Sequence, residues 1–315
     1  MMDGTDRHCR YFHRLLSRRA RLYTEMITAE AILHGDRDYL LGFDESEHPV
    51  ALQLGGSDPD KLAQSAKIGA RFGYDEINLN VGCPSDRVQS GAFGACLMKT
   101  PELVRDCVVA MKSAVDIPVT VKHRIGVDNQ DPNQILFEFV DTVASAGCEV
   151  FIVHGRMAWL EGLSPKENRT IPPLDYDLVR RLKRERPDLT IVLNGGIETI
   201  DQSVELLPDF DGVMLGRAAY GDPYILSRVD SDVFNEHDAP PSREEVVRAM
   251  SVYVKDHFRR GVRPFSITRH MLGLYHGVKG ARAWRRFLSE NAPVMRDDVL
   301  DRALDTVSEA ARAYA

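Results

Sequence analysis

The sequence lacks several features that would place it in a special class of protein. Its 315 residues contain no run of 18 or more apolar residues, which argues against a membrane-spanning helix. The polar start, Met1 to His8, has no apolar segment of the kind found in secretory signals. The five cysteines include no CxxC pair and are odd in number, which argues against a zinc site and a disulfide framework. We therefore expect a cytoplasmic protein without a bound metal.

An overall excess of basic charge is also missing, since the formal net charge is −7. That value hides an uneven distribution. Residues 255–286 contain nine Lys or Arg and a single acid, Asp256. A solvated helix face is one explanation, but such faces usually mix both signs. A stretch of one sign favours contact with a nucleic-acid backbone.

Short apolar runs alternate with helical patterns from about residue 20 to residue 218, which is typical of βα units around a parallel sheet. The expected strands lie at 21–24, 50–54, 76–80, 119–122, 150–154, 191–194 and 212–215. A closed barrel of this class needs eight strands, and the chain opens on a helix-like segment at 6–17. We expect an α/β fold, a TIM (β/α)8-type barrel whose first strand is truncated to Met1 and Met2.

The pattern changes after Tyr220. A linker at 238–242 contains two prolines and ends in a serine that can cap a helix. Helical periodicities then follow, near 242–260, 265–276, 280–291 and 296–314. We expect two domains, a barrel at 1–237 and an all-helical domain at 238–315.

The segment from Asn78 to Ser85 carries the most informative motif. Ile77, Leu79 and Val81 alternate with polar residues as in a strand, and Gly82-Cys83-Pro84 must then leave the sheet because proline cannot donate to a ladder. This places the Cys83 thiol at the carboxyl end of a strand, where barrels of this class carry out their chemistry. The alternative is a small buried hydrophobic residue before a turn, as is common for free cysteines.

Three other strand ends carry polar side chains suited to a flavin. Gln53 precedes two glycines and could bond a ring edge through its amide. Lys122 could stabilise the negative charge of a reduced flavin. His154 ends the next strand; a lone histidine there is more often a core residue, but the neighbouring lysine favours a site.

The last two strands end in glycine motifs, Asn194-Gly195-Gly196 and Gly216-Arg217. Barrels bind phosphate at this position through glycine amides, and an arginine adds a charge-assisted fork. Together the two motifs indicate a phosphorylated cofactor such as FMN. A long loop at 159–173 carries Lys166 and Arg169, which could clamp successive phosphates or form a charged lid.

These residues carry a resemblance to a known family. The motifs Asn80-Val81-Gly82-Cys83-Pro84-Ser85 and Ser164-Pro165-Lys166-Glu167-Asn168-Arg169 resemble those of the tRNA-dihydrouridine synthases, specifically the A subfamily that acts at positions 20 and 20a. The similarity runs nearly end to end. It implies an FMN-bearing TIM barrel and a helical domain that holds tRNA. It also implies NADPH-linked reduction of the 5,6 double bond of D-loop uridines.

The resemblance also implies roles for individual residues. Cys83 would donate the proton to C5 of uracil after hydride passes from flavin N5 to C6. The residues that would hold FMN are Met1, Met2, Gln53, Lys122, His154, Asn194, Gly195, Gly196, Gly216 and Arg217. Those that would contact tRNA are Asn80, Lys166, Arg169, Arg282 and Arg285. Trp284 is expected to pack inside the helical domain, and the protein is expected to be monomeric.

The sequence departs from the family pattern near its start, where Gly4 replaces a tryptophan, and at Met157, where the family has lysine. Two alternatives therefore stay open. One is a tRNA-binding protein whose flavin site is impaired by the missing first strand. The other is a flavoenzyme that reduces a free pyrimidine, which would leave the basic helical segment without a use.

Overall fold

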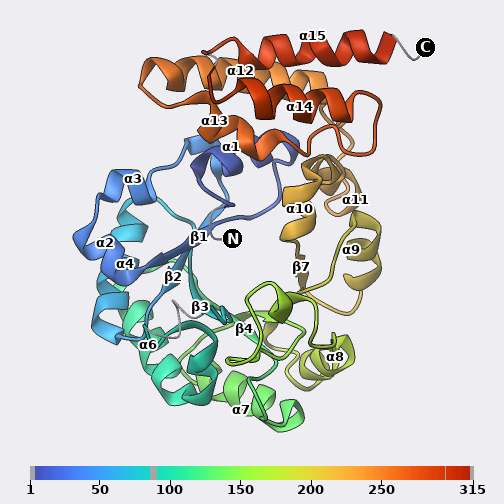
Figure 1. Cartoon of the computed structure of the whole chain (residues 1–315). Helices are drawn as coiled ribbons and strands as arrows, with labels where there is room; N and C mark the ends of the chain where they lie inside the picture. Colours follow the sequence, from blue (N-terminus) through green and yellow to red (C-terminus); the bar gives the residue numbers. More distant parts are fainter. Residues whose placement is uncertain (1–3, 86–90, 295, 313–315) are drawn as a thin grey trace.

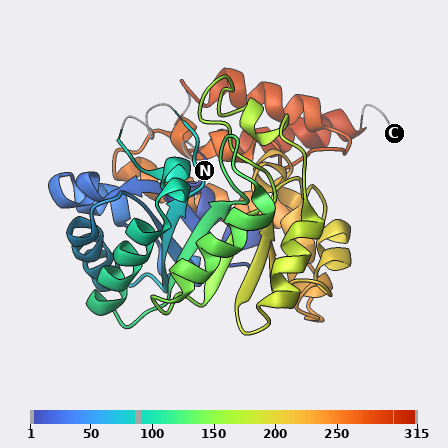
Figure 2. The ribbon, with the colours of Figure 1, turned by 90° about the horizontal axis from the view of Figure 1, so that it is seen from below.

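Seven parallel strands form one curved sheet in the computed structural model, which describes residues 4–85, 91–294 and 296–312. The strands follow one another in sequence order: β1 (Leu22–Thr28), β2 (Val50–Gly55), β3 (Glu76–Val81), β4 (Val119–Arg124), β5 (Val150–His154), β6 (Thr190–Asn194) and β7 (Gly212–Met214). All seven predicted strands are present. Figures 1 and 2 show them inside a ring of helices, as in a TIM-type barrel.

The helices of the barrel precede, separate and follow the strands along the chain. They are α1 (Arg7–Leu16), α2 (Ala29–His34), α3 (Arg37–Leu41), α4 (Pro59–Arg71), α6 (Pro101–Ala114), α7 (Pro132–Ala144), α8 (Tyr176–Glu185), α9 (Ile200–Leu206), α10 (Arg217–Gly221) and α11 (Val229–Asp232). Short 3₁₀ turns complete it: η1 (Glu45–Glu47), η2 (Gly94–Lys99), η3 (Glu167–Arg169) and η4 (Pro223–Arg228). Local sequence sets several of the starts. Asp6 accepts from the amides of His8 and Cys9 to cap α1, and Pro59 follows the cap Asp58 at the start of α4.

The chain after residue 238 is helical. It contains α12 (Arg243–Arg259), α13 (Pro264–Thr268), η5 (Arg269–Met271), α14 (Ala281–Asn291) and α15 (Val299–Arg312). Figure 1 shows these helices, in orange and red, gathered beyond α1 and α10. Their buried side chains share one hydrophobic cluster with Phe12 and Leu16 of α1. The C-terminal helices therefore pack directly on the barrel.

The two ends of the sheet are not joined within the described residues, because β1 pairs only with β2 and β7 only with β6. Met1 and Met2, expected to form the remnant of a first strand and to contact the cofactor, lie outside the described residues. Helix α1 instead lies against β1, η1 and η4.

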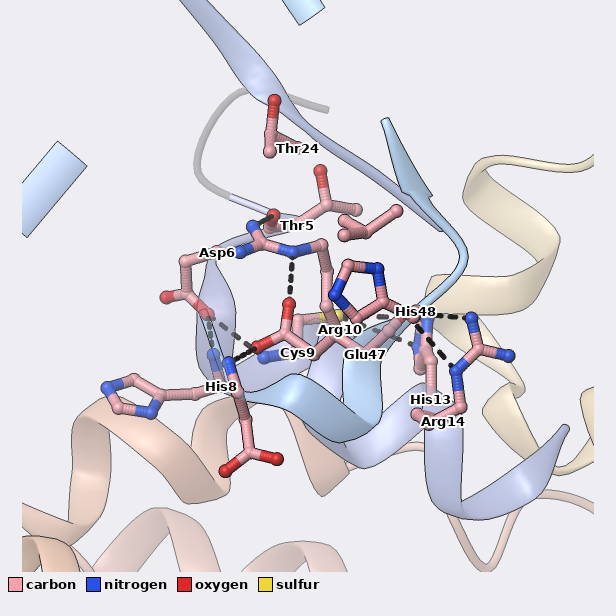
Figure 3. A network of polar contacts seen from close by, with 12 residues as sticks. Thr5, Asp6, His8, Cys9, Arg10, His13, Arg14, Thr24, Glu47 and His48 are labelled. Atoms are coloured by element: carbon pink, nitrogen blue, oxygen red, sulfur yellow. Dashed lines mark hydrogen bonds and ion pairs between the residues drawn. The ribbon is translucent and has the colours of Figure 1, made fainter. Parts of the chain in front are cut away.

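A polar network fixes α1 in this position (Figure 3). The Arg10 Nε donates to Glu47 Oε2 at 2.6 Å, and both side chains are buried. Asp6 accepts from Arg269 Nη2 at 2.7 Å and bonds His270 Nε2 at 3.0 Å. Burial opposes ionisation of Asp6, but its bonds with His270, Cys9 N and Arg269 outweigh that effect and lower its pKa. The start of the chain is thus tied to both the barrel and the C-terminal helices.

Buried neutral histidines make the fold sensitive to acid. Burial lowers the pKa of His13 to about 3 and of His8 and His123 to about 4. The unfolded chain binds protons at these imidazoles below pH 6.5, whereas the folded chain does not. We therefore expect the free energy of unfolding to fall between pH 6.5 and 4, by up to about 1.4 kcal/mol per pH unit for each histidine.

Urea denaturation at a series of pH values measures this effect. The His123→Phe variant serves as a comparison, since the His123 ring already contacts Phe139 and Phe151. The slope of its free energy of unfolding against pH should be smaller by the contribution of one histidine. Equal stability of the unsubstituted chain at pH 4.5 and pH 7 would contradict the expectation.

Candidate active site

Strand register brings the predicted site residues onto one face of the sheet. Asn80 pairs with Lys122, and His154 pairs with both Arg124 and Asn194. Residues that share a register level, or lie two apart along a strand, point to the same face. Gln53, which pairs with Asn78, follows the same alternation. The apolar residues that alternate with them, Leu79, Val81, Val121, Val153 and Leu193, belong to the hydrophobic core.

Buried amides connect the floor of this face to the Cys83 loop. Gln53 Nε2 donates to Asn78 Oδ1 at 2.9 Å, and Asn80 Nδ2 donates to Gln53 Oε1 at 2.8 Å. Asn80 Oδ1 then accepts from the backbone amides of Gly82 and Cys83, both at 3.0 Å. Gln53 and Asn80, predicted separately for flavin and for tRNA, are therefore directly bonded. Asn80 fixes the backbone that carries the thiol.

The Cys83 thiol lies outside the hydrophobic core. Its side chain is half-buried, whereas Cys9, Cys107 and Cys148 are buried. The sulfur is 3.5 Å from Ser85 Oγ, and the Cys83 carbonyl accepts from the amide of Ala95 at 2.9 Å. This environment agrees with a reactive thiol more than with the alternative of a core residue.

Lys122 is a partly buried cation on the same face of the sheet. Burial and, to a smaller extent, the nearby Arg124 lower its pKa to about 8, whereas Cys83 acts in the opposite direction. Its ammonium makes no hydrogen bond or ion pair within the part of the chain that the structure describes. Burying an ammonium without a hydrogen-bond acceptor costs free energy, so Lys122 is suited to bind a ligand that supplies an acceptor.

His154 and Gly195 form a second unsatisfied feature. Burial lowers the pKa of His154 well below its usual value, so the ring is neutral, and its Nε2 has no partner among the described residues. Gly195 adopts a φ of +104° beside this ring. A Cβ at Gly195 would lie 2.3 Å from His154 Cδ2. Only glycine allows this approach.

The second glycine motif lies close to the long loop. Asn194 Nδ2 donates to the Met214 carbonyl at 2.7 Å, which joins β6 to β7 at their carboxyl ends. Arg217, which follows Gly216, is exposed, and its Nη2 donates to the Arg169 carbonyl at 3.2 Å. The structure thus brings together Arg217, predicted for the cofactor phosphate, and Arg169, predicted for tRNA.

The loop at 159–173 is organised by a residue that sequence reasoning did not single out. Asn168 is fully buried. Its Oδ1 accepts from Trp159 N at 2.7 Å, and its Nδ2 donates to the Trp159 carbonyl at 2.8 Å and the Leu163 carbonyl at 3.1 Å. This leaves Lys166 exposed, while Arg169 Nε donates to the Pro165 carbonyl at 2.8 Å.

In the basic stretch at 255–286, fewer cations are available to bind a ligand than the composition indicates. Four of its nine cations form ion pairs with carboxylates: Lys255 with Asp301, Arg260 with Asp256, Arg269 with Asp6 and Arg286 with Glu290. Arg282 and Arg285 are exposed and form no ion pair with a described residue. Trp284 between them is fully buried and donates to the Met271 carbonyl at 2.8 Å, which confirms that it packs inside the helical segment.

No helix within 4–85, 91–294 and 296–312 is long and apolar enough to cross a bilayer. Among those same residues, no group of three or more His, Cys, Asp or Glu side chains is placed to hold a metal ion.

Comparison with known proteins decides the family. The family model described as dihydrouridine synthase (Dus) matches residues 1–312. The chain belongs to the dihydrouridine synthase family. A relative within it, the tRNA-dihydrouridine(20/20a) synthase of Shewanella oneidensis, is 60% identical over 292 residues, which cover 93% of this chain and 87% of the relative. The protein of the same name from Salmonella typhimurium is 57% identical over 312 residues, covering 98% of this chain and 94% of the relative.

The fold is also found outside the dihydrouridine synthases. The solved structure of a 2-naphthoyl-CoA reductase complex superimposes with a TM-score of 0.52, over 72% of this chain and 47% of that chain. The two sequences are 10% identical, so this likeness concerns the fold alone.

Proposed function

We propose that the protein reduces uridines 20 and 20a in the D-loop of tRNA to dihydrouridine, with FMN as cofactor and NADPH as reductant. The observation that carries this proposal is the placement of a half-buried thiol on the loop fixed by Asn80, on the sheet face that also carries Lys122 and His154 Nε2, which have no hydrogen-bond partner among the described residues. The Shewanella and Salmonella relatives bear the name of this activity.

The residues present fit a flavin mononucleotide. Lys122 and His154 Nε2, which have no hydrogen-bond partner among the described residues, offer polar groups to a ring, and Gly195 allows the His154 ring to lie against the backbone at the end of β6. Asn194, Gly195, Gly196, Gly216 and Arg217 are the candidates for the phosphate end, and Gln53 for the ring edge. When bound and reduced, FMN supplies the hydride that adds to C6 of uracil.

Cys83 is then the acid. Its S–H bond breaks as a C5–H bond forms, and the sulfur keeps the electron pair. Asn80 fixes the thiol in position by holding two consecutive backbone amides. The target base must leave its stack to reach this site, which is easier for a loop nucleotide than for one in a duplex. Lys166 and Arg169 lie on the neighbouring loop, where they can contact the flanking phosphates.

We also propose the division of labour between the two parts of the chain. Residues 1–237 form the catalytic barrel, and residues 238–315 hold the tRNA. In this proposal the enzyme is a monomer and works in the cytoplasm. Arg282 and Arg285 support this assignment, because they are exposed, lie three residues apart on α14 and form no ion pair with any residue that the structure describes.

The experiment that tests the function uses the full-length protein with FMN, NADPH and an unmodified tRNA transcript. We expect a bound flavin absorbance band and dihydrouridine at positions 20 and 20a. A colourless protein that binds tRNA but forms no dihydrouridine would overturn the proposal and support a tRNA-binding role instead.

The affinity for FMN should depend on the charge of Lys122. Because its pKa is lowered to about 8, the ammonium loses its proton as pH rises through that value. We expect the Kd for FMN, measured by fluorescence quenching, to increase between pH 7 and pH 9. The Lys122→Arg variant keeps its charge over this range, so its Kd should change little. Parallel pH curves for both proteins would contradict the role of Lys122.

Binding of tRNA should depend on the unpaired arginines of α14. The double variant Arg282→Ala with Arg285→Ala should weaken tRNA binding and reduce the slope of log K against log salt by about 2, since two phosphate contacts are lost. Arg286→Ala is the matched control, because Arg286 lies on the same helix but is paired with Glu290. Filter binding at several salt concentrations measures both. Equal losses in the two proteins would contradict the assignment.

A further inference from the structure

Arg124 is a buried cation on the inner face of the sheet that the proposed chemistry has not used. It ends β4, two residues after Lys122, and its side chain is 2% exposed. It forms no ion pair within the described residues. Burial lowers its pKa to about 10, so the guanidinium is still protonated at neutral pH. A buried charge without a counter-ion needs good hydrogen bonds to be tolerated.

Its hydrogen bonds join two loops that are far apart in sequence. Nε donates to the carbonyl of Gly82, the residue before Cys83, at 3.2 Å. Nη1 donates to the carbonyls of Asn168 at 2.9 Å and Met157 at 3.2 Å. The planar guanidinium therefore connects the thiol loop to the loop that carries Lys166 and Arg169. Its fixed fork makes this geometry specific, in a way that a lysine cannot reproduce.

The guanidinium of Arg124 also lies close to the thiol. Its Nε donates to the carbonyl of the residue before Cys83, and Cys83 raises the pKa of both Arg124 and Lys122. A thiol that donates its proton becomes a thiolate, and nearby cations favour that state. The bond to the Gly82 carbonyl thus holds the Arg124 cation one residue away from the sulfur on which negative charge develops.

We propose that Arg124 is a positioning residue for Cys83, which holds Gly82 against the loop at 159–173 and stabilises the thiolate left when the proton moves to C5 of uracil. In this step the S–H bond breaks, the C5–H bond forms and the sulfur keeps the electron pair. The proposal rests on the proposed function for its role in turnover. Its effect on the thiol is independent of that function.

Alkylation of Cys83 by iodoacetamide tests the electrostatic effect without tRNA or turnover. The full-length protein carries Cys96→Ala, because Cys96 is the other half-buried cysteine, and peptide mass spectrometry follows Cys83 alone. Arg124→Met should move the alkylation midpoint to higher pH and slow the reaction at pH 7 by about tenfold. Arg124→Lys keeps the charge and should restore the profile.

Arg14 provides a matched control. It too is a buried arginine bonded to backbone carbonyls, those of Ser17, Ala20, Glu47 and Pro49. Arg14→Met should lower stability but leave the alkylation profile of Cys83 unchanged. The proposal is overturned if Arg124→Met leaves the profile unchanged, if Arg14→Met shifts it equally, or if Arg124→Lys behaves as Arg124→Met.

Arg124→Lys also tests the geometric effect, and it does so even if Arg124→Met does not fold. With the fork lost, kcat for uridine reduction should fall about 10- to 100-fold while KM for tRNA stays the same. An unchanged kcat would overturn the positioning role. If Cys83→Ala were fully active while Arg124→Met still shifted alkylation, the proposed function would fail and the Arg124–Cys83 coupling would stand.

Discussion

Replacing Cys83 by alanine should lower the rate of dihydrouridine formation by about 10²- to 10⁴-fold, the range typical of removing a general acid. The thiol is the proton donor in the proposed reaction, and its hydrogen-bond neighbour Ser85 Oγ, at 3.5 Å, is a far weaker acid. Flavin content and tRNA affinity should be unchanged, since the Asn80 bonds are to the backbone of the loop. The product is measured by mass spectrometry of nucleosides from digested tRNA.

Cys107→Ala is the matched control for this substitution. Its sulfur lies on α6 and contacts the Ser57 carbonyl at 3.6 Å, and burial raises its pKa to about 12, so it has no part in the reaction. This variant should form dihydrouridine at the normal rate. Full activity of Cys83→Ala would show that another group donates the proton.

Replacing Arg10 by methionine should lower the free energy of unfolding by about 3–5 kcal/mol, the cost typical of removing one partner of a buried ion pair. Glu47 is fully buried, and burial already raises its pKa while Arg10 opposes that effect. Without Arg10 the bond from the Asp44 amide at 2.9 Å is the one hydrogen bond that the described residues leave to this carboxylate. Urea denaturation monitored by circular dichroism measures the loss.

The double variant Arg10→Met with Glu47→Leu separates the charge from the packing. Because no uncompensated charge is left, it should recover much of the lost stability. A double variant less stable than Arg10→Met would show that Glu47 stabilises the fold through its bond to Asp44 rather than through Arg10.

The barrel was predictable because local sequence patterns identify its strands. Alternation defined β3, and glycine or proline marked the strand ends, so all seven strands were found. The helix expected at 265–276 was wrong, because only α13 and η5 form there. Gly273 lies so close to α10 that a Cβ would be 2.2 Å from the Gly221 carbonyl, and Gly277 has a φ of +72°. Such tertiary contact and backbone geometry do not follow from helical periodicity.

The site was predictable to the extent that its residues end strands. Arg124 and Asn168 were missed because their partners are backbone carbonyls and amides far away in sequence, which no spacing reveals. The basic surface was overestimated for a related reason. Asp6 and Asp301, which neutralise Arg269 and Lys255, lie outside the basic stretch and meet it only in the folded chain.

The most direct test follows the reduced flavin itself. Unmodified tRNA is added without oxygen to the full-length protein whose bound FMN has been reduced, and flavin absorbance is recorded over a single turnover. The flavin should be reoxidised as dihydrouridine forms at positions 20 and 20a, and it should stay reduced in the Cys83→Ala variant over the same time. A flavin that tRNA leaves reduced in the unsubstituted protein would contradict the account.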